Sequence, residues 1–446
     1  MKKIYFIGIG GIGVSALARY YLSEGYQVFG SDSTSSDLII ALKSEGCDII
    51  IGEESNRIDT SFEKVIHTEA IPDTQSELQK AKSCGLKILK YSEALGEVSD
   101  AYKLIAIAGT HGKSTTTSMI SQILLNSKED FLSIVGTILK EFGGKNFYKR
   151  GKEKNYCVIE ACEYKKHFLS YRPLVCVITN IEYDHADYFK TQEEYTESFE
   201  AFINNIRVGG FCIIGKDTFS LSLIGKRKDI HYISISDDYF EYGVEKHYFP
   251  QIEMKIPGEH ILYDARLAYV VGYLIGIPDY TILEALENYS GVWRRMEIIG
   301  ETKYSNILMS DYGHHPTEIR VTLEALKNGY PNKKLIVVFQ PHQYSRTLEL
   351  LKGFQNCFSY ADTVIIPNIY ASRDSEMDMQ KISARSLTES IDHPQVIFGD
   401  GFKNTLEILN EYEIKNPNSS IILLQGAGDI DTLREKIHLK ETKKAL

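Results

Sequence analysis

The stretch from Lys103 to Leu125, KLIAIAGTHGKSTTTSMISQILL, constrains the fold of this chain more than any other segment. Its apolar residues 104–108 have high strand propensity and are followed at once by Gly109. A helical pattern of apolar residues then begins near Lys113. The stretch therefore predicts a strand, a glycine turn and a helix, in that order.

The turn between this strand and helix has the chemistry of a phosphate-binding loop. Backbone N–H groups at a helix N-terminus have no partner inside the helix, and the helix dipole favours negative charge there. Lys113 adds a cation, and Ser114 adds a hydroxyl that can bind Mg²⁺. A standard P-loop has a glycine where this chain has Ile107, so the motif is a shortened variant. The alternative is a plain strand–helix turn with a solvated lysine.

A second strand, glycine turn and helix is predicted at the N-terminus, followed by another strand. Gly8, Gly10 and Gly13 fit the pattern G-x-G-x-x-G, and Asp32 ends the next strand about 20 residues later. The glycines let the backbone approach a pyrophosphate, and the acid can reach a ribose hydroxyl. Any nucleoside diphosphate would fit, so NAD(P), a UDP-linked sugar and a purely structural turn all remain open.

Strand and helix patterns alternate along the whole chain, which predicts an α/β fold of three domains. A length of 446 residues allows about three domains, each with its own core. A polar linker over 97–103 ends the first domain, and Arg294 and Arg295 stand at the second junction. The expected domains are a Rossmann-like domain over 1–99, a central P-loop domain with a mostly parallel sheet over 100–297, and a Rossmann-like C-terminal α/β domain over 298–446.

Polar side chains gather near the ends of two strands predicted after the P-loop, over 157–168 and 175–178. These side chains are Glu160, Glu163, Asn180, Asp184, His185 and Asp187. Because the carboxyl ends of parallel strands meet at one sheet edge, we expect this group beside the P-loop. Acid and imidazole groups there could complete a Mg²⁺ shell begun by Ser114. The alternative is ordinary loop polarity with a structural histidine.

The C-terminal half carries two further candidate features. Arg294 and Arg295 could form a solvated pair or clamp a transferring phosphoryl group. Three predicted strand ends in the third domain are followed by polar segments, at 310–318, 340–346 and 425–431. These segments lie where a site would form in a parallel sheet.

Composition excludes several classes of protein. The apolar fraction of 43% and the charged fraction of 25% are those of a soluble globular protein. A net charge of −10 argues against nucleic acid as a partner. No apolar run approaches the length of a membrane-spanning helix, so no membrane insertion is expected. Seven scattered cysteines without a C-x-x-C pair indicate reduced thiols, which favours the cytoplasm.

Taken together, the segments resemble the Mur ligases, the ATP-dependent amide-forming enzymes of peptidoglycan precursor synthesis. The resemblance covers essentially the whole chain. The motifs that carry it, in the family's order, are IGIGGIGVSALA, AGTHGKSTTT, TNIEYDHADYF, RRMEIIGE, DYGHHPTEI, FQPHQYSRT and GAGDI.

The resemblance implies a function for each domain. The first would bind the UDP part of UDP-N-acetylmuramate, the central domain ATP and Mg²⁺, and the third an amino acid. In the family's mechanism the substrate carboxylate attacks the γ-phosphate of ATP, and an amine then attacks the acyl phosphate. The motifs are most similar to those of family members that add L-alanine, so L-alanine is the expected amino acid.

The resemblance also implies roles for individual residues. Contacts to ATP are expected from Gly109, Thr110, His111, Gly112, Lys113, Ser114, Thr115, Asn180, His260, Arg295 and Asp311. Contacts to the sugar nucleotide are expected from Gly8, Gly10, Gly11, Ile12, Gly13, Asp32 and His67, and contacts to the amino acid from Tyr312, His314, His342 and Arg346. The expected metal ligands are Ser114, Glu163 and His185, with Glu160 as the alternative to Glu163. The expected catalytic residues are Lys113, His185 and Arg295, with His314 or His315 orienting the amine.

Several positions depart from the family's pattern. Cys162 and Lys165 replace acids in the motif EACEYK, and Ile261 replaces an amide beside the adenine. Gln343 stands where some relatives have arginine, and Met296 where phenylalanine is usual. The third domain could therefore prefer an amino acid other than L-alanine.

Other functions remain open at this point. A Mur-type ligase could add a different amino acid or a recycled peptide to UDP-N-acetylmuramate. An NAD(P)-dependent oxidoreductase built on the first domain would leave the P-loop and the polar clusters without a purpose. The changes at Cys162, Lys165 and Ile261 are consistent with a silent nucleotide-binding regulator. A monomer or weak homodimer is expected.

Overall fold

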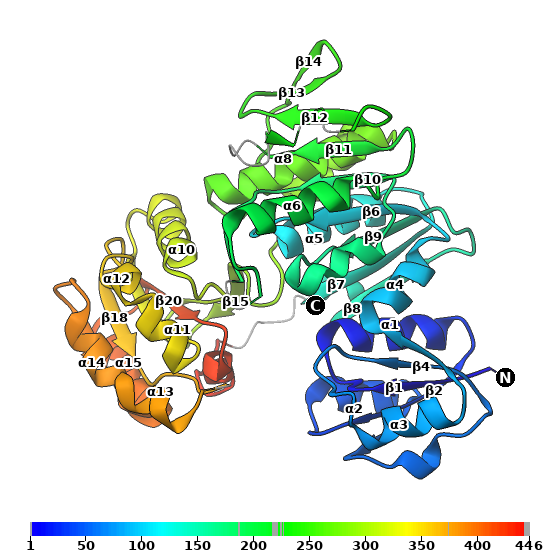
Figure 1. Ribbon diagram of the computed structural model, residues 1–446. Helices are drawn as coiled ribbons and strands as arrows, with labels where there is room; N and C mark the ends of the chain where they lie inside the picture. Colours follow the sequence, from blue (N-terminus) through cyan, green and yellow to red (C-terminus); the bar gives the residue numbers. More distant parts are fainter. Residues whose placement is uncertain are drawn as a thin grey trace, which may run out of the picture. The chain divides into compact units, whose positions relative to one another are not determined.

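The computed structural model describes residues 2–185, 188–215, 222–223, 225, 227–372 and 374–440. Asp187, one of the polar residues predicted near the P-loop, lies outside these ranges. The described chain forms three sheets, of five, nine and six strands, flanked by helices (Figure 1). The predicted α/β fold class is confirmed. The chain divides into two compact units: unit 1 is residues 1–253 with 263–287, and unit 2 is residues 254–262 with 288–446.

The first sheet of unit 1 is parallel throughout. Its elements are β1 (Lys3–Ile7), α1 (Ile12–Ser23), β2 (Gln27–Asp32), α2 (Asp37–Ser44), β3 (Asp48–Ile51), η1 (Ser55–Arg57), β4 (Phe62–His67), α3 (Ser76–Ser83), β5 (Lys87–Lys90) and α4 (Tyr91–Ser99). The strand order is β3-β2-β1-β4-β5. Ile4 and Phe6 pack with α1, α2 and α4, whereas Tyr5 and Ile7 face α3, as strand alternation requires. The strand, glycine turn, helix and strand predicted at the N-terminus are confirmed.

The second sheet of unit 1 contains the P-loop. Its elements are β6 (Lys103–Ala108), α5 (Lys113–Asn126), β7 (Phe131–Leu139), η2 (Lys140–Phe142), β8 (Lys145–Arg150), β9 (Tyr156–Glu160), η3 (Tyr164–Ser170), β10 (Val175–Ile178), α6 (Gln192–Ile203), β11 (Phe211–Ile214), β12 (His231–Ile235), β13 (Tyr239–Tyr242), β14 (Glu245–Tyr248), α8 (Glu259–Leu274) and α9 (Asp279–Glu287). The order is β14-β13-β12-β11-β10-β6-β9-β7-β8. Among the described strands of this sheet, the pairs β7–β8, β12–β13 and β13–β14 are antiparallel and the other pairs are parallel. Residues 115–124 of α5 are all buried, so this helix is a core element.

Unit 2 holds the third sheet, in the order β15-β16-β20-β17-β18-β19. Its elements are β15 (Glu297–Glu301), β16 (Ile307–Asp311), α10 (Pro316–Gly329), β17 (Lys334–Phe339), α11 (Tyr344–Glu349), α12 (Leu351–Phe354), β18 (Thr363–Ile366), α13 (Glu376–Lys381), α14 (Ala384–Ser390), β19 (Val396–Phe398), α15 (Gly401–Lys415), β20 (Ser420–Gln425) and η4 (Asp429–Glu435). Edge strand β15 is antiparallel to β16, and the other pairs are parallel. Within the described residues, no helix combines the length and the hydropathy that crossing a membrane requires.

Two local predictions were wrong. The strand expected over 157–168 ends at Glu160, because the chain enters a short 3₁₀ segment in which Lys165 and Lys166 have left-handed φ values of 50° and 60°. The polar linker expected from Glu97 is still helical, since α4 continues to Ser99 with Val98 buried. The antiparallel hairpin of β7 and β8 was not predicted at all.

This hairpin braces the N-terminal helix of the same unit. Helix α1 packs against both β7 and β8. Asn146 of β8 is fully buried; its Nδ2 donates to the Ile12 carbonyl and, at 2.9 Å, to Ser15 Oγ. Its Oδ1 accepts from the buried guanidinium of Arg19, which also pairs with Glu45 at 2.9 Å. One side chain of the central sheet therefore fixes the first turn of the helix that follows the N-terminal glycines.

We predict that Asn146→Ala lowers the free energy of unfolding by about 2–3 kcal/mol, because the Nη1 group of Arg19 and the Ile12 carbonyl lose their hydrogen bonds to Asn146 in a buried site. Calorimetry and urea unfolding followed by circular dichroism would measure the change. Asn126→Ala, at the exposed end of α5, is the control and should change stability by less than about 0.5 kcal/mol. Equal stability of the two variants would contradict the bracing role.

Candidate active site

The P-loop of unit 1 depends on two glycines. Gly109 and Gly112 have φ values of 133° and 81°, which other residues rarely adopt. A Cβ on Gly109 would lie 2.0 Å from Thr179 Oγ1, and one on Gly112 would lie 2.5 Å from Asp264 Oδ1. No side chain among the described residues caps the N-terminus of α5. The N–H groups of its first turn are therefore available to an anion such as a phosphate.

Lys113 is held across this loop. Its Nζ donates to the carbonyls of Gly109 and Thr110, at 2.5 and 3.1 Å, and lies 3.1 Å from Glu163 Oε2. Burial lowers the pKa of Lys113, but Glu163 and Cys162 outweigh burial and raise it above its usual value. The lysine therefore remains a cation, and its charge is positioned over the turn before any ligand binds.

Glu163 connects this lysine to His185. The carboxylate is 1% exposed, and His185 Nε2 lies 3.4 Å from its Oε1. Burial raises the pKa of Glu163, but Lys113 and His185 bring it below its usual value. Burial likewise lowers the pKa of His185, and Glu163 more than reverses that effect. Lys113, Glu163 and His185 form one mutually stabilised group of charges.

Ser114 is paired with Glu160 rather than with Glu163. Its Oγ donates to Glu160 Oε2 at 2.9 Å, and Glu160 Oε1 accepts from the Gly136 N–H at 2.5 Å. A hydroxyl and a carboxylate oxygen at this separation are suitable donors for a hard divalent cation. No group of three or more His, Cys, Asp or Glu side chains is arranged as a metal site in the described part of the chain.

Asn180 supports the loop backbone. Its Oδ1 accepts from the His111 N–H at 3.0 Å, and its Nδ2 donates to the His111 carbonyl at 3.1 Å. Thr110 Oγ1 donates to the Glu182 carbonyl at 2.7 Å, and His111 Nε2 lies 3.1 Å from Glu182 Oε2. Glu182 and Thr179 were not singled out from the sequence, although both lie within four residues of the end of β10 at the predicted sheet edge.

The N-terminal glycine turn is also braced by side chains. Gly8 has a φ of 77°, and a Cβ there would lie 2.4 Å from Thr68 Cγ2. Asp32 Oδ2 accepts from the Gly10 N–H at 2.8 Å, and His67 Nδ1 lies 3.0 Å from the Thr68 carbonyl. Helix α1 starts at Gly11 without a side-chain cap from the described residues. Asp32 thus shapes the turn, and the helix N-terminus stays open to an anion.

In unit 2, the buried carboxylate of Asp311 accepts hydrogen bonds from several neighbouring segments. Its Oδ1 accepts from the Met296 N–H at 3.0 Å. Its Oδ2 accepts from the Gly313 N–H, Thr322 Oγ1 and Gln425 Nε2, at 3.0 to 3.3 Å. Asp311 therefore fixes the segments on either side of β16, and its carboxylate is already fully hydrogen-bonded.

The two adjacent arginines of unit 2 have different roles. Arg294 is buried, and its Nη2 donates to the carbonyls of Gly426 and Gly428. The Arg295 guanidinium lies 4.9 Å from the centre of the Tyr312 ring. The interpretation as a solvated pair is therefore wrong for Arg294, and Arg295 is the more exposed of the two.

Three predicted amino-acid contacts lie together in unit 2. The ring of His314 lies 5.6 Å from that of Tyr312 and 6.1 Å from that of His342. Burial lowers the pKa of His314 to about 4, although Glu318 opposes this and Arg346 adds to it. The imidazole is therefore neutral at neutral pH.

The other predicted histidines of unit 2 have structural contacts. His315 is the N-cap of α10, where its Nδ1 accepts from the Thr317 N–H at 3.3 Å. Its own N–H donates to Glu318 at 3.1 Å. His260 packs against Gly258, and burial lowers its pKa despite the opposing charge of Asp311. The capping contacts of His315 favour His314 as the residue that orients an amine.

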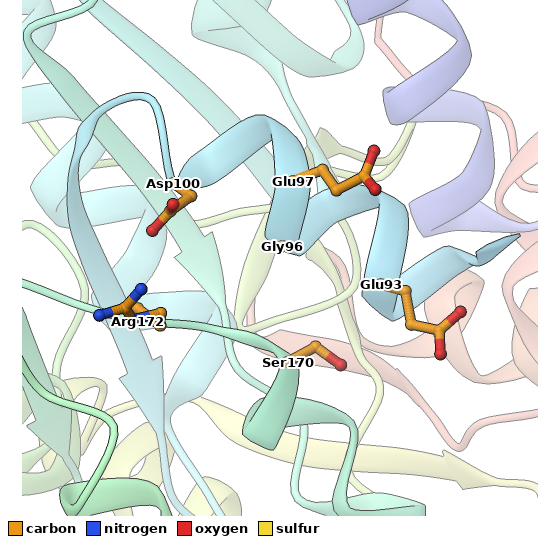
Figure 2. Close-up of a pocket in the computed structure, with 6 residues that line it drawn as sticks. All are labelled: Glu93, Gly96, Glu97, Asp100, Ser170 and Arg172. Carbon is orange, nitrogen blue, oxygen red and sulfur yellow. The ribbon is translucent and has the colours of Figure 1, made fainter. Parts of the chain in front are cut away.

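A pocket of about 340 Å³ lies elsewhere in unit 1. Its lining residues are Glu93, Gly96, Glu97, Asp100, Ser170 and Arg172 (Figure 2). Three carboxylates and one guanidinium make this an unfavourable place for a phosphate. None of the residues predicted for the nucleotide, metal or amino-acid sites lines it.

The fold and the two open glycine turns define a multidomain α/β nucleotide-binding protein with a P-loop. Three family models match consecutive parts of the chain: the Mur ligase family catalytic domain at 3–103, the Mur ligase middle domain at 107–272 and the Mur ligase glutamate ligase domain at 294–428. The chain belongs to the Mur ligase family, and the resemblance found in the motifs is confirmed.

Individual relatives agree over nearly full length. The UDP-N-acetylmuramate–L-alanine ligases of Clostridium acetobutylicum and Caldicellulosiruptor saccharolyticus are 35% and 37% identical, over 97% and 98% of both chains. The crystal structure of a UDP-N-acetylmuramate–alanine ligase from Thermotoga maritima has a TM-score of 0.79 and 25% identity, covering 98% of both chains. A murein peptide ligase from Psychrobacter arcticus shares the fold, with a TM-score of 0.67 and 22% identity over 98% of both chains.

We predict that Lys113→Ala lowers ATP-dependent turnover at least about 100-fold, because it removes the cation held over the phosphate-binding turn. Phosphate release would be measured together with the thermal midpoint, since Glu163 loses its partner. Lys128→Ala, an exposed lysine just beyond α5, is the matched control and should retain full turnover. Wild-type turnover in Lys113→Ala would exclude this loop as the ATP site.

The half-buried, desolvated His314 should make unit 2 sensitive to acid. The unfolded chain binds a proton at a pKa of about 6.5, but the folded chain binds it only near pH 4. The contribution of the neutral imidazole is thus present above pH 6.5 and lost as the pH falls towards 4. His314→Gln should reduce the acid destabilisation by up to about 3 kcal/mol. Urea unfolding followed by the fluorescence of Trp293, the single tryptophan, tests this, and parallel pH profiles would contradict it.

Proposed function

We propose that this chain is an ATP-dependent ligase that joins L-alanine to the carboxylate of UDP-N-acetylmuramate in peptidoglycan precursor synthesis. The observation that carries the proposal is the P-loop of unit 1, where Lys113 lies across an open helix N-terminus next to the Ser114–Glu160 pair. The full-length relatives support the choice of substrates, because they are named as ligases of UDP-N-acetylmuramate and L-alanine.

The reaction needs charge neutralisation. The substrate carboxylate attacks the γ-phosphorus of ATP, the bond to the β,γ-bridging oxygen breaks and ADP leaves. The amine of L-alanine then attacks the acyl phosphate, loses a proton and displaces inorganic phosphate. Two anions must meet in the first step, and Lys113 and the open N–H groups of α5 would stabilise the developing charge.

The Ser114 hydroxyl and the Glu160 carboxylate are oxygen groups of the kind that bind a magnesium ion. Ser114 and Glu160 would bind the ion directly. His185, which Glu163 holds in place, would lie at the edge of this site. The bound Mg²⁺ would neutralise phosphate charge. This assignment favours Glu160, the alternative carboxylate of the sequence prediction, as a direct ligand and gives Glu163 the task of holding Lys113 and His185.

The third sheet would bind the amino acid. Tyr312, His342 and Arg346 would contact it, and the neutral imidazole of His314 can accept a hydrogen bond from the amine. With a pKa near 4, His314 is a weak base, so its role would be orientation rather than proton removal. Gln343, which has a left-handed φ of 68° and precedes α11, stands next to this group and is the reason to test other amino acids.

The first assay follows phosphate release from ATP and Mg²⁺ with UDP-N-acetylmuramate and L-alanine, glycine or L-serine, or with no amino acid. Release that needs both the sugar nucleotide and L-alanine is expected. If release depends on another amino acid instead, we would infer that the loop containing Gln343 determines the amino-acid specificity. No release with any of them would contradict the proposal, and NADH binding would favour the oxidoreductase alternative. The enzyme is expected in the cytoplasm as a monomer or weak homodimer.

A further inference from the structure

Tyr91 lies directly against the N-terminal glycine turn. It is the first residue of α4 and immediately follows β5, at the carboxyl edge of the first sheet. A Cβ on Gly13 would come within 2.6 Å of both Cζ and Oη of Tyr91. The absence of a side chain at Gly13 therefore lets the phenol reach the first turn of α1.

The same phenol faces the P-loop side of unit 1. Burial raises the pKa of Tyr91 above its usual value, and the negative charge of Glu160 adds to this. Glu160 is the carboxylate that pairs with Ser114. The tyrosine thus lies against the glycine turn and close enough to Glu160 to be affected by its charge, and its hydroxyl is protonated and able to donate.

The Tyr91 hydroxyl makes no hydrogen bond within the described residues, although other buried polar groups of the first sheet do. Tyr5, for example, donates to Glu77 at 2.7 Å. The Tyr91 side chain is half-buried, so its hydroxyl remains accessible to a ligand. This accessible donor beside the N-terminal glycine turn is available to an acceptor on a ligand.

We propose that Tyr91 is a substrate-binding residue whose hydroxyl donates a hydrogen bond to the muramyl end of the sugar nucleotide, at the carboxylate to be phosphorylated. This inference rests on the proposed function. With the diphosphate at the glycine turn and the carboxylate at the γ-phosphate, the sugar must pass between the two turns. A donor at Tyr91 would offset the repulsion of that carboxylate by Glu160.

Tyr91→Phe tests the inference, because it removes only the hydroxyl and keeps the ring against Gly13. The KM for UDP-N-acetylmuramate is expected to rise about tenfold, with the affinity for ATP and the thermal midpoint unchanged. Tyr21→Phe is the matched control, since this α1 tyrosine is also buried and makes no hydrogen bond through its hydroxyl within the described residues. It should leave the KM unchanged.

The outcomes separate this inference from the proposed function. An unchanged KM in an active Tyr91→Phe enzyme overturns the role of Tyr91 and leaves the ligase intact. Equal KM changes in Tyr91→Phe and Tyr21→Phe also overturn it, because the effect would then come from packing. If the wild type shows no turnover, the proposed function fails. Calorimetric titration with UDP-N-acetylmuramate then decides, and equal affinities of wild type and Tyr91→Phe overturn the inference.

Discussion

Two helices of unit 1 begin at a glycine without a side-chain cap from the described residues, and the nucleotide chemistry of the chain depends on this constraint. Helix α1 starts at Gly11 and helix α5 at Gly112. A capping serine or aspartate would stabilise either helix but would also occupy the N–H groups that a phosphate needs. Other side chains stabilise the two turns instead. Asp32 accepts a hydrogen bond from the backbone N–H of Gly10, and Asn180 accepts one from the backbone N–H of His111.

The charges next to α5 are arranged to hold one another in the absence of ligand. Burying Glu163 alone would be costly, and Lys113 and His185 offset that cost from two sides. A bound nucleotide would present new anionic partners to Lys113, so binding would exchange one set of ion pairs for another. This arrangement keeps the loop ordered and leaves its positive charge available.

Much of the fold and part of the candidate site could be predicted from the sequence. The strand–glycine–helix segments depend on local patterns, and both were correct at β1–α1 and β6–α5. Contacts between distant segments could not be inferred in this way. The pairing of Ser114 with Glu160, the capping by His315 and the bracing of α1 by Asn146 all depend on how the chain packs. The end of β9 was misplaced because neither glycine nor proline marks it, and left-handed lysines form the turn instead.

The buried core of unit 1 runs without interruption from one face of the first sheet into the second sheet. Residues such as Phe6, Leu17 and Leu95 belong to the same apolar cluster as Leu104 and Ile178. The two sheets look like separate modules in the sequence, but they share one interior. On heating, they should melt in one calorimetric transition. A chain cut after the first sheet would expose the apolar surface of α1 and aggregate, so the boundary between the two sheets is not a boundary of folding.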